Sequence, residues 1–264
     1  MSYPGKIIIW IGFASILMAS RPGVADLAQQ AQNPVADLIS VPLQNNTNFG
    51  LGPDDRTQNI LNVQPVWPFK LSDDWNLITR TIIPVTSQPL PDGSRKNGLG
   101  DTTLTAYFSP RNESSLIWGA GPVVLIPTST DDSLGLGEWG GGLSAVALTM
   151  PGDWVIGSLI SNVWADSGDD TKKDINLFTW QYFVNYNIPG GNGLYLVSAP
   201  IITADWNAGS SDRWTVPFGG GIGKIFKIGN QPVNAQVSEY YNVEKPEFGP
   251  DWQLRLQLQF LFHQ

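Results

Sequence analysis

The sequence predicts an all-β fold, an antiparallel up-and-down transmembrane β-barrel of about twelve strands with short periplasmic turns and longer external loops. The first observation is the C-terminal stretch LRLQLQFLF, Leu254 to Phe262, where apolar residues alternate with Arg255, Gln257 and Gln259. This period of two is typical of a strand that faces lipid on one side and a wet interior on the other. The second observation is the alternation of short and long connecting segments. The third is the position of tryptophans near strand ends.

The composition favours a partly apolar surface. The chain has 264 residues, of which 14% are charged and 11 are tryptophan. Amphipathic tryptophan rings are enriched where lipid meets water. The formal net charge of −8 argues against nucleic-acid binding. Cysteine is absent, which excludes disulfides and cysteine-based metal sites.

The N-terminus predicts a secretory signal peptide over residues 1–25. Lys6 precedes a short apolar run, Ile7 to Met18, and the small residues Gly23 to Ala25 precede a possible cleavage point. A membrane anchor is the alternative, but the run is shorter than the ~20 residues of a spanning helix. Removing residues 1–25 removes two positive charges, so −8 becomes −10. Residues 26–36 are predicted to be a periplasmic lead-in, and residues 37–264 the barrel.

The predicted strands are runs of strand-forming residues separated by turn residues. Within 58–69, Pro65 and Pro68 are unfavourable in a regular strand, so we expect a bulge or local fraying there. In 115–127 and 153–165 both faces are apolar or small, and the pattern leaves open which face points inward. The twelve strands are predicted at 37–48, 58–69, 75–86, 101–109, 115–127, 137–149, 153–165, 174–188, 194–206, 213–226, 231–243 and 251–262.

The connecting segments alternate in length along the chain. Those after even-numbered strands are tight: KLSDD, SPRNES, MPGD, PGGN and IGN. Those after odd-numbered strands are longer and more acidic, as in GLGPDDRTQ, SQPLPDGSRKNGLG and DSGDDTKK. An up-and-down barrel places alternate connections at opposite ends, and outer-membrane barrels have short periplasmic turns and longer external loops. An even strand count then leaves both chain ends in the periplasm.

One face of the clearer strands is polar, and we expect it to line the pore. Arg80 and Arg255 should face the lumen, because an arginine facing lipid at mid-depth costs about 2–4 kcal/mol. Glu239 has the parity of an apolar face, and we predict a bulge near Gln236–Ser238 that turns it inward to pair with Arg255. The alternative is a solvated Glu239 near a rim. The predicted pore-lining residues are Gln44, Asn46, Asn62, Gln64, Arg80, Thr179, Gln181, Asn185, Glu239, Gln253, Arg255, Gln257 and Gln259.

The tryptophans are expected to form two membrane-interface belts, since a soluble core would instead place them in the middle of strands. Only Trp180 is predicted to lie mid-strand. The external belt is predicted to contain Trp139, Trp164, Trp206, Trp214 and Trp252, and the periplasmic belt Trp67, Trp75, Trp118 and Trp154.

Catalytic groups are scarce in the sequence. The only histidine is His263, next to the chain end, so a positioned general base is lacking and no enzyme activity is expected. Adjacent aspartates such as Asp131 and Asp132 are expected to be solvated, with weak divalent-ion sites bridging lipopolysaccharide phosphates as the alternative. The runs Gly137–Gly142 and Phe218–Gly223 lack the lysine and helix of a phosphate loop. They are expected to allow close strand approach or a wider lumen. No cofactor and no metal site are predicted.

Several segments together resemble a bacterial family often labelled "neuromedin U" or "transporter", within the group tagged putative MetA-pathway of phenol degradation. The resemblance covers nearly the whole mature chain, that is, the chain after residue 25. It implies an outer-membrane β-barrel that moves small molecules, and it supplies no catalytic residues. The ending His263–Gln264 departs from barrels that end on an aromatic residue. The segments are NPVADLISVPLQNNTNFG, QNILNVQPVWPF, DDWNLITRTIIPV, GLGDTT, WGAGPVVLIPTSTDD and LRLQLQFLF.

The leading functional hypothesis is an outer-membrane channel for passive passage of small solutes. An amide-rich lumen with Arg80 and Arg255 suits neutral or weakly anionic solutes, and the resemblance alone suggests aromatic ones. The expected partners are outer-membrane lipid and lipopolysaccharide, the barrel-assembly machinery during insertion, and the solute itself. The alternatives are a closed barrel that acts structurally or in adhesion through its loops, an outer-membrane enzyme, and a soluble all-β protein.

Overall fold

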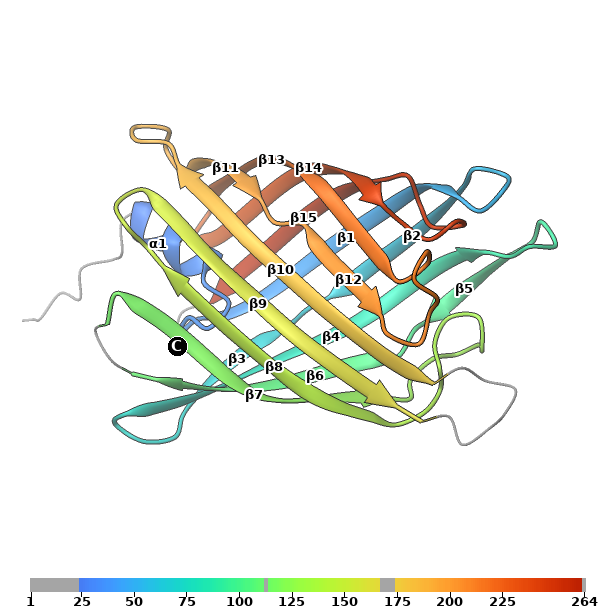
Figure 1. The fold of residues 1–264 in the computed structure, drawn as a ribbon. Coiled ribbons are helices and arrows are strands. Elements are labelled where there is room, and N and C mark those ends of the chain that lie inside the picture. Colours follow the sequence, from blue (N-terminus) through green and yellow to red (C-terminus); the bar gives the residue numbers. More distant parts are fainter. Residues whose placement is uncertain (1–23, 112–113, 167–173, 263–264) are drawn as a thin grey trace, which may run out of the picture.

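The computed structural model describes residues 24–111, 114–166 and 174–262 and shows a closed antiparallel β-barrel with one short helix (Figure 1). Fifteen strands combine into twelve barrel strands because three are interrupted, which confirms the predicted fold class. The elements are α1 (Val24–Gln32), β1 (Ile39–Leu51), β2 (Arg56–Val63), β3 (Val66–Lys70), β4 (Trp75–Pro89), β5 (Arg95–Leu99), β6 (Thr102–Pro110), β7 (Leu116–Ile126), β8 (Gly140–Thr149), β9 (Trp154–Ala165), β10 (Ile175–Asn187), β11 (Leu194–Ser198), β12 (Ile201–Asp205), β13 (Trp214–Ile228), β14 (Gln231–Glu244) and β15 (Trp252–Phe262).

The ring closes where the last strand, β15, pairs with the first, β1, with Ile39 opposite Phe262. β2 and β3 form one barrel strand that is broken at Gln64–Pro65, as predicted, because proline has no N–H to donate to the ladder. β5 and β6 are separated at Gly100–Asp101, and β11 and β12 at Ala199–Pro200. The sequence analysis did not anticipate the last two breaks.

The two ends of the barrel differ. One end, here the turn end, carries the tight connections and both ends of the described chain, and the opposite end is the loop end (Figure 1). Two predicted loops proved shorter than expected. β1 and β2 continue until only residues 52–55 connect them, and β4 and β5 until only residues 90–94 remain. Paired backbone groups extend the ladder there, because hydrogen bonds between neighbouring strands satisfy the backbone without regard to side-chain pattern.

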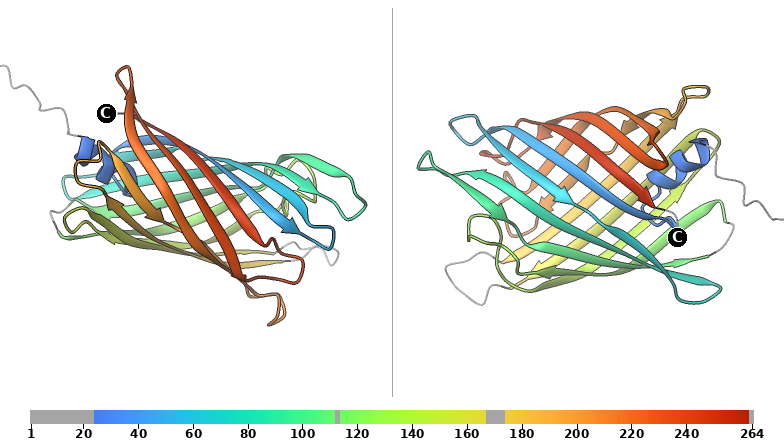
Figure 2. Two further views of the ribbon diagram at one scale, coloured as in Figure 1. Left: turned by 90° about the horizontal axis from the view of Figure 1, so that it is seen from above. Right: turned by 180° about the vertical axis from the view of Figure 1, so that it is seen from behind.

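The helix α1 lies inside the barrel at the turn end. Both views of Figure 2 show it in the mouth where the C-terminal strand also ends. Its sequence, VADLAQQAQ, is rich in good helix formers. Leu27 and Ala28 are each 1% exposed and Val35, in the following segment, is 5% exposed. Residues 26–36, predicted as a lead-in, are therefore inserted into the lumen, and the sequence analysis did not predict this helix. No helix of the described residues is long and apolar enough to cross a bilayer.

Two strand glycines leave room for aromatic rings inside the barrel. A Cβ at Gly223 would lie 2.1 Å from Cζ of Tyr195, and one at Gly157 would lie 2.4 Å from Cζ of Phe183. Both rings are almost fully buried, at 1% for Tyr195 and 6% for Phe183. At Gly223 the missing side chain leaves room for the ring of Tyr195. The expectation that the glycines of Phe218–Gly223 allow closer approach of strands stays a prediction.

Candidate functional site

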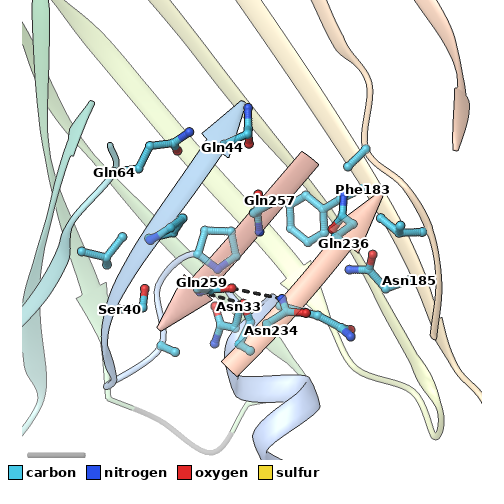
Figure 3. Close-up of a pocket in the computed structure, with 18 of the residues that line it drawn as sticks. Asn33, Ser40, Gln44, Gln64, Phe183, Asn185, Asn234, Gln236, Gln257 and Gln259 are labelled. Carbon is cyan, nitrogen blue, oxygen red and sulfur yellow. Dashed lines mark hydrogen bonds between the residues drawn. The ribbon is translucent and has the colours of Figure 1, made fainter. Parts of the chain in front are cut away.

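A cavity of about 150 Å³ lies in the lumen next to α1 (Figure 3). Its lining joins the end of α1 and the segment after it to residues of β1, β3, β4, β9, β10, β11, β14 and β15. Most of its polar side chains are amides, and Figure 3 shows Gln44, Gln236 and Gln257 around the same space as the ring of Phe183. Among these described lining residues the only charged side chains are Arg80 and Arg255.

One side of the lumen, formed by β14, β15, β1, β2 and part of β4, is an amide wall. Gln253 donates to Asn48 at 2.8 Å, Asn48 donates to Gln58 at 2.7 Å, and Gln58 donates to Gln88. Nearer the turn end, Asn234 donates to Gln259 at 3.1 Å. These amides lie on neighbouring strands at lumen-facing positions. The ladder satisfies polar groups that would otherwise be buried without partners.

The two arginines belong to the amide wall. Arg255 is 3% exposed and donates to Asn46 Oδ1 at 3.1 Å, Gln253 Oε1 at 3.0 Å and the Ala199 carbonyl at 2.8 Å. Arg80 donates to Gln64 Oε1 at 2.6 Å. The side chains that accept hydrogen bonds from the two arginines are neutral amides: Asn46 and Gln253 for Arg255, and Gln64 for Arg80.

The opposite side, formed by β6 to β11, is an apolar wall. Its apolar lumen-facing side chains pack in one cluster with Leu27, Ala28 and Val35 from the N-terminal segment. Gln181 and Asn185 of β10 are polar positions on this side, and they line the cavity. Burying a side chain such as Leu27 contributes about 1.5–3 kcal/mol, so this contact holds α1 in the lumen. The members from the strands include Tyr107, Val146, Leu148, Val155, Leu159, Phe183, Tyr195 and Val197.

Twelve of the predicted pore-lining positions face the lumen, as cross-strand partners share a face. Their role in conduction stays a prediction. Eight line the cavity: Gln44, Gln64, Arg80, Gln181, Asn185, Arg255, Gln257 and Gln259. The other four lie on the same inner faces outside the lining: Asn46 and Asn62 (opposite Arg255 and Gln44), Thr179 (two residues from Gln181) and Gln253 (bonded to Asn48).

The predicted pair between Glu239 and Arg255 was wrong. The register of β14 on β15 runs without a shift from Val233 to Tyr241, so there is no bulge to turn Glu239 inward. Its neighbour Tyr240 is buried in the lumen at 1% exposure, and alternation therefore points Glu239 outward, where it is exposed. It lies two residues from Tyr241, which is paired with Trp252 at the loop end.

The nine predicted belt tryptophans lie in two groups, one at each end of the barrel, and Trp180 lies mid-strand in β10 as predicted. At the turn end the rings of Trp75 and Trp118 are in edge contact at 6.0 Å, and Trp154 lies 4.6 Å from Tyr186. At the loop end Trp206 and Trp214 are in contact at 5.7 Å. The remaining predicted belt members keep the ends assigned to them: Trp67 with the turn end, and Trp139, Trp164 and Trp252 with the loop end. Their contact with a membrane interface stays a prediction.

Several lumen residues escaped the sequence analysis. Asn48, Gln58 and Gln88 complete the amide ladder, and Asn234 and Gln236 line the cavity. Asn48 and Gln58 could have been found, since they continue the alternation of predicted polar faces. His263 lies outside the described residues. Within the described part of the chain, no three His, Asp or Glu side chains are grouped so that they could hold a metal ion.

Comparison with known proteins gives a structural likeness. No family model and no curated protein matches the sequence. The structure is similar to the COG4313 outer membrane channel from Pseudomonas putida F1, with a TM-score of 0.65 and 20% identity over 85% of this chain and 94% of that chain. The CymD monoaromatic hydrocarbon channel gives 0.47 and 10% identity, over 91% of each chain. Outer membrane phospholipase A from Escherichia coli gives 0.41 and 12% identity, over 85% of this chain and 96% of that chain. The fold is therefore that of an outer-membrane β-barrel.

Proposed function

We propose that this protein is a passive channel of the bacterial outer membrane for small amphipathic solutes that are neutral or weakly anionic. The observation that carries the proposal is a closed barrel whose cavity has an amide wall facing an apolar wall. A solute with one polar and one apolar side makes favourable contacts with both. The likeness to the Pseudomonas putida outer membrane channel supports a channel rather than an enzyme.

The proposal includes export through the periplasm after removal of residues 1–25, and insertion by the barrel-assembly machinery. Lipid and lipopolysaccharide would then surround the outer face. Exposed apolar side chains support this surface, such as Leu143 at 65%, Phe218 at 70% and Ile222 at 51% exposure. Contiguous exposed apolar surface of this kind is rare on soluble monomers.

The second candidate is a closed barrel that acts through its loops without conductance. The observation that favours it is the packing of Leu27 and Ala28 in the lumen at the turn end. In that case α1 would stay packed against the apolar wall and would keep the turn end of the lumen closed.

Reconstitution into planar bilayers and proteoliposomes separates the two candidates. A channel gives stepwise ionic conductance and admits benzyl alcohol faster than protein-free liposomes do. Absence of conductance and of solute entry, from protein that retains its β-sheet circular dichroism, would leave the closed barrel as the better account.

A further inference from the structure

Arg255 is a buried cation that has no carboxylate partner among the described residues. Its guanidinium donates to Asn46, Gln253 and the Ala199 carbonyl, all neutral, and lies 4.7 Å from the ring centre of Tyr240. Within the described residues neither Arg255 nor Arg80 takes part in an ion pair. Removing a charge from water without a counter-charge is costly, and neutral acceptors and an aromatic face offset only part of that cost.

The guanidinium has hydrogen-bonding capacity left. A guanidinium carries five N–H groups, and the three bonds that Arg255 makes to described residues use one on each nitrogen. Arg255 also lines the lumen cavity, where no described lining residue is acidic. The site therefore combines a fixed positive charge, free donors and adjacent space.

The net negative charge of the chain does not cancel the positive charge of Arg255 inside the lumen. Aspartates at the loop end are largely exposed, as with Asp54, Asp55 and Asp132. The field of an exposed charge is screened beyond about 8 Å at physiological salt. A charge enclosed by the barrel wall is screened much less, so the potential in the cavity is set by Arg255 and Arg80.

Apolar side chains lie beside the charged group. Gln181 donates to the Ala199 carbonyl at 3.5 Å, the same oxygen that Arg255 contacts, so Arg255 reaches the edge of the apolar wall. On β10 the next lumen-facing residue after Gln181 is Phe183. On β11 the lumen-facing residue nearest Ala199 is Val197. Both line the cavity. Figure 3 shows Phe183 facing the amide side chains across this space. An acid group at Arg255 would thus place its apolar part against Phe183 and Val197.

We propose that Arg255 is the anchor of a binding site for the carboxylate of a small amphipathic acid. This inference rests on the proposed function, because it names the preferred solute class of the same lumen. The carboxylate accepts from the free N–H groups of Arg255, and the apolar part of the acid packs on the apolar wall. Neutral solutes of the same shape use only the second contact.

The test is direct binding of three probes with the same ring and different charge. Isothermal titration of the full-length protein in a neutral detergent with benzoate, benzyl alcohol and benzylammonium needs no conductance. We expect benzoate to bind most tightly and benzylammonium most weakly. Arg255→Gln should weaken benzoate about tenfold, the loss of one charge-assisted hydrogen bond of about 1.4 kcal/mol, and leave benzyl alcohol unchanged. Arg255→Lys should restore part of the difference.

Lys224→Gln is the matched control, because Lys224 is an exposed cation on the outer face of β13. It should leave all three affinities unchanged. Equal affinity for benzoate and benzylammonium in the natural protein would overturn the proposal, as would a benzoate affinity that survives Arg255→Gln. Should Arg255→Gln fail to fold, Arg255→Lys decides. It should bind benzoate more weakly than the natural protein does and benzyl alcohol equally well, because an ammonium keeps the charge but lacks the fork of N–H donors. Benzoate affinity equal to that of the natural protein would then contradict the site. Benzoate binding without conductance leaves this site standing and removes the proposed function, whereas conductance without charge preference does the reverse.

Discussion

The two walls of the lumen contrast in how their residues are held. On the amide wall, side chains such as Asn48 and Gln253 bond to one another across strands. On the apolar wall, Val155 and Leu148 are at most 2% exposed and pack against the segment that carries Leu27. The difference teaches that the inside of a barrel need not be wet all round. Where a chain segment folds into the lumen, the strands facing it place apolar side chains such as Val155 and Leu148 on their inner face.

The strongest way to break this comparison is to remove the inserted segment. Deleting residues 26–36 should raise single-channel conductance several-fold, because the part of α1 that occupies the turn-end mouth is lost. The barrel should also lose stability, since the apolar wall becomes exposed to water. Planar-bilayer recording measures the first effect and urea unfolding in detergent the second. Unchanged conductance would mean that the segment does not limit passage.

A glycine substitution tests the packing of the apolar wall. Gly223→Ala places a Cβ 2.1 Å from Cζ of Tyr195, and such overpacking should destabilise the barrel by about 1–3 kcal/mol in urea unfolding. Gly141→Ala is the control, because nothing lies within 4 Å of a Cβ there. Equal midpoints for the two variants would show that the ring of Tyr195 adjusts freely.

The corresponding test of the amide wall removes one rung of the ladder. Asn48→Leu leaves Gln253 and Gln58 without their partner, which should cost about 1–3 kcal/mol in the same unfolding assay. Asn62→Leu makes the matched change at another lumen-facing position, where the described residues show no side-chain hydrogen bond. The ladder contributes little if the two variants unfold alike.

Charges at the rim should matter less than those in the lumen. Hydrogen bonds from Ser133 and from Lys96 lower the pKa of Asp131 to about 2. Because this pKa is lowered, ionised Asp131 stabilises the folded loop. The stabilisation is complete above the unfolded pKa of 3.8 and is lost as the pH falls through about 2. Pepsin cleavage within residues 127–139 should therefore accelerate between pH 4 and pH 2 more than in Asp131→Asn. A pH profile shared by both proteins would contradict this.

The smallest effect is expected outside the barrel wall. Glu239→Gln should leave ion selectivity unchanged, because Glu239 faces outward and does not meet Arg255. Reversal potentials in a salt gradient measure this, with Arg255→Gln for comparison. A shift as large as that of Arg255→Gln would place the carboxylate in the conduction path.

The sequence by itself determined the barrel, its strand count and the inward face of the polar strands. Alternation with a period of two is local, so Gln44 and Asn46, or Gln257 and Gln259, reveal their face without knowledge of their neighbours. The break at Pro65 was equally local, because it follows from a missing N–H.

Only the tertiary structure decided where residues 26–36 lie, what β7 and β9 face, and which partner Arg255 takes. The apolar inner faces of β7 and β9 have a cause far away in the chain, the insertion of Leu27, Ala28 and Val35. The orientation of Glu239 depended on the uninterrupted register between β14 and β15. Both are long-range packing outcomes, and a single strand's pattern carries no information about which segment will fill the space beside it.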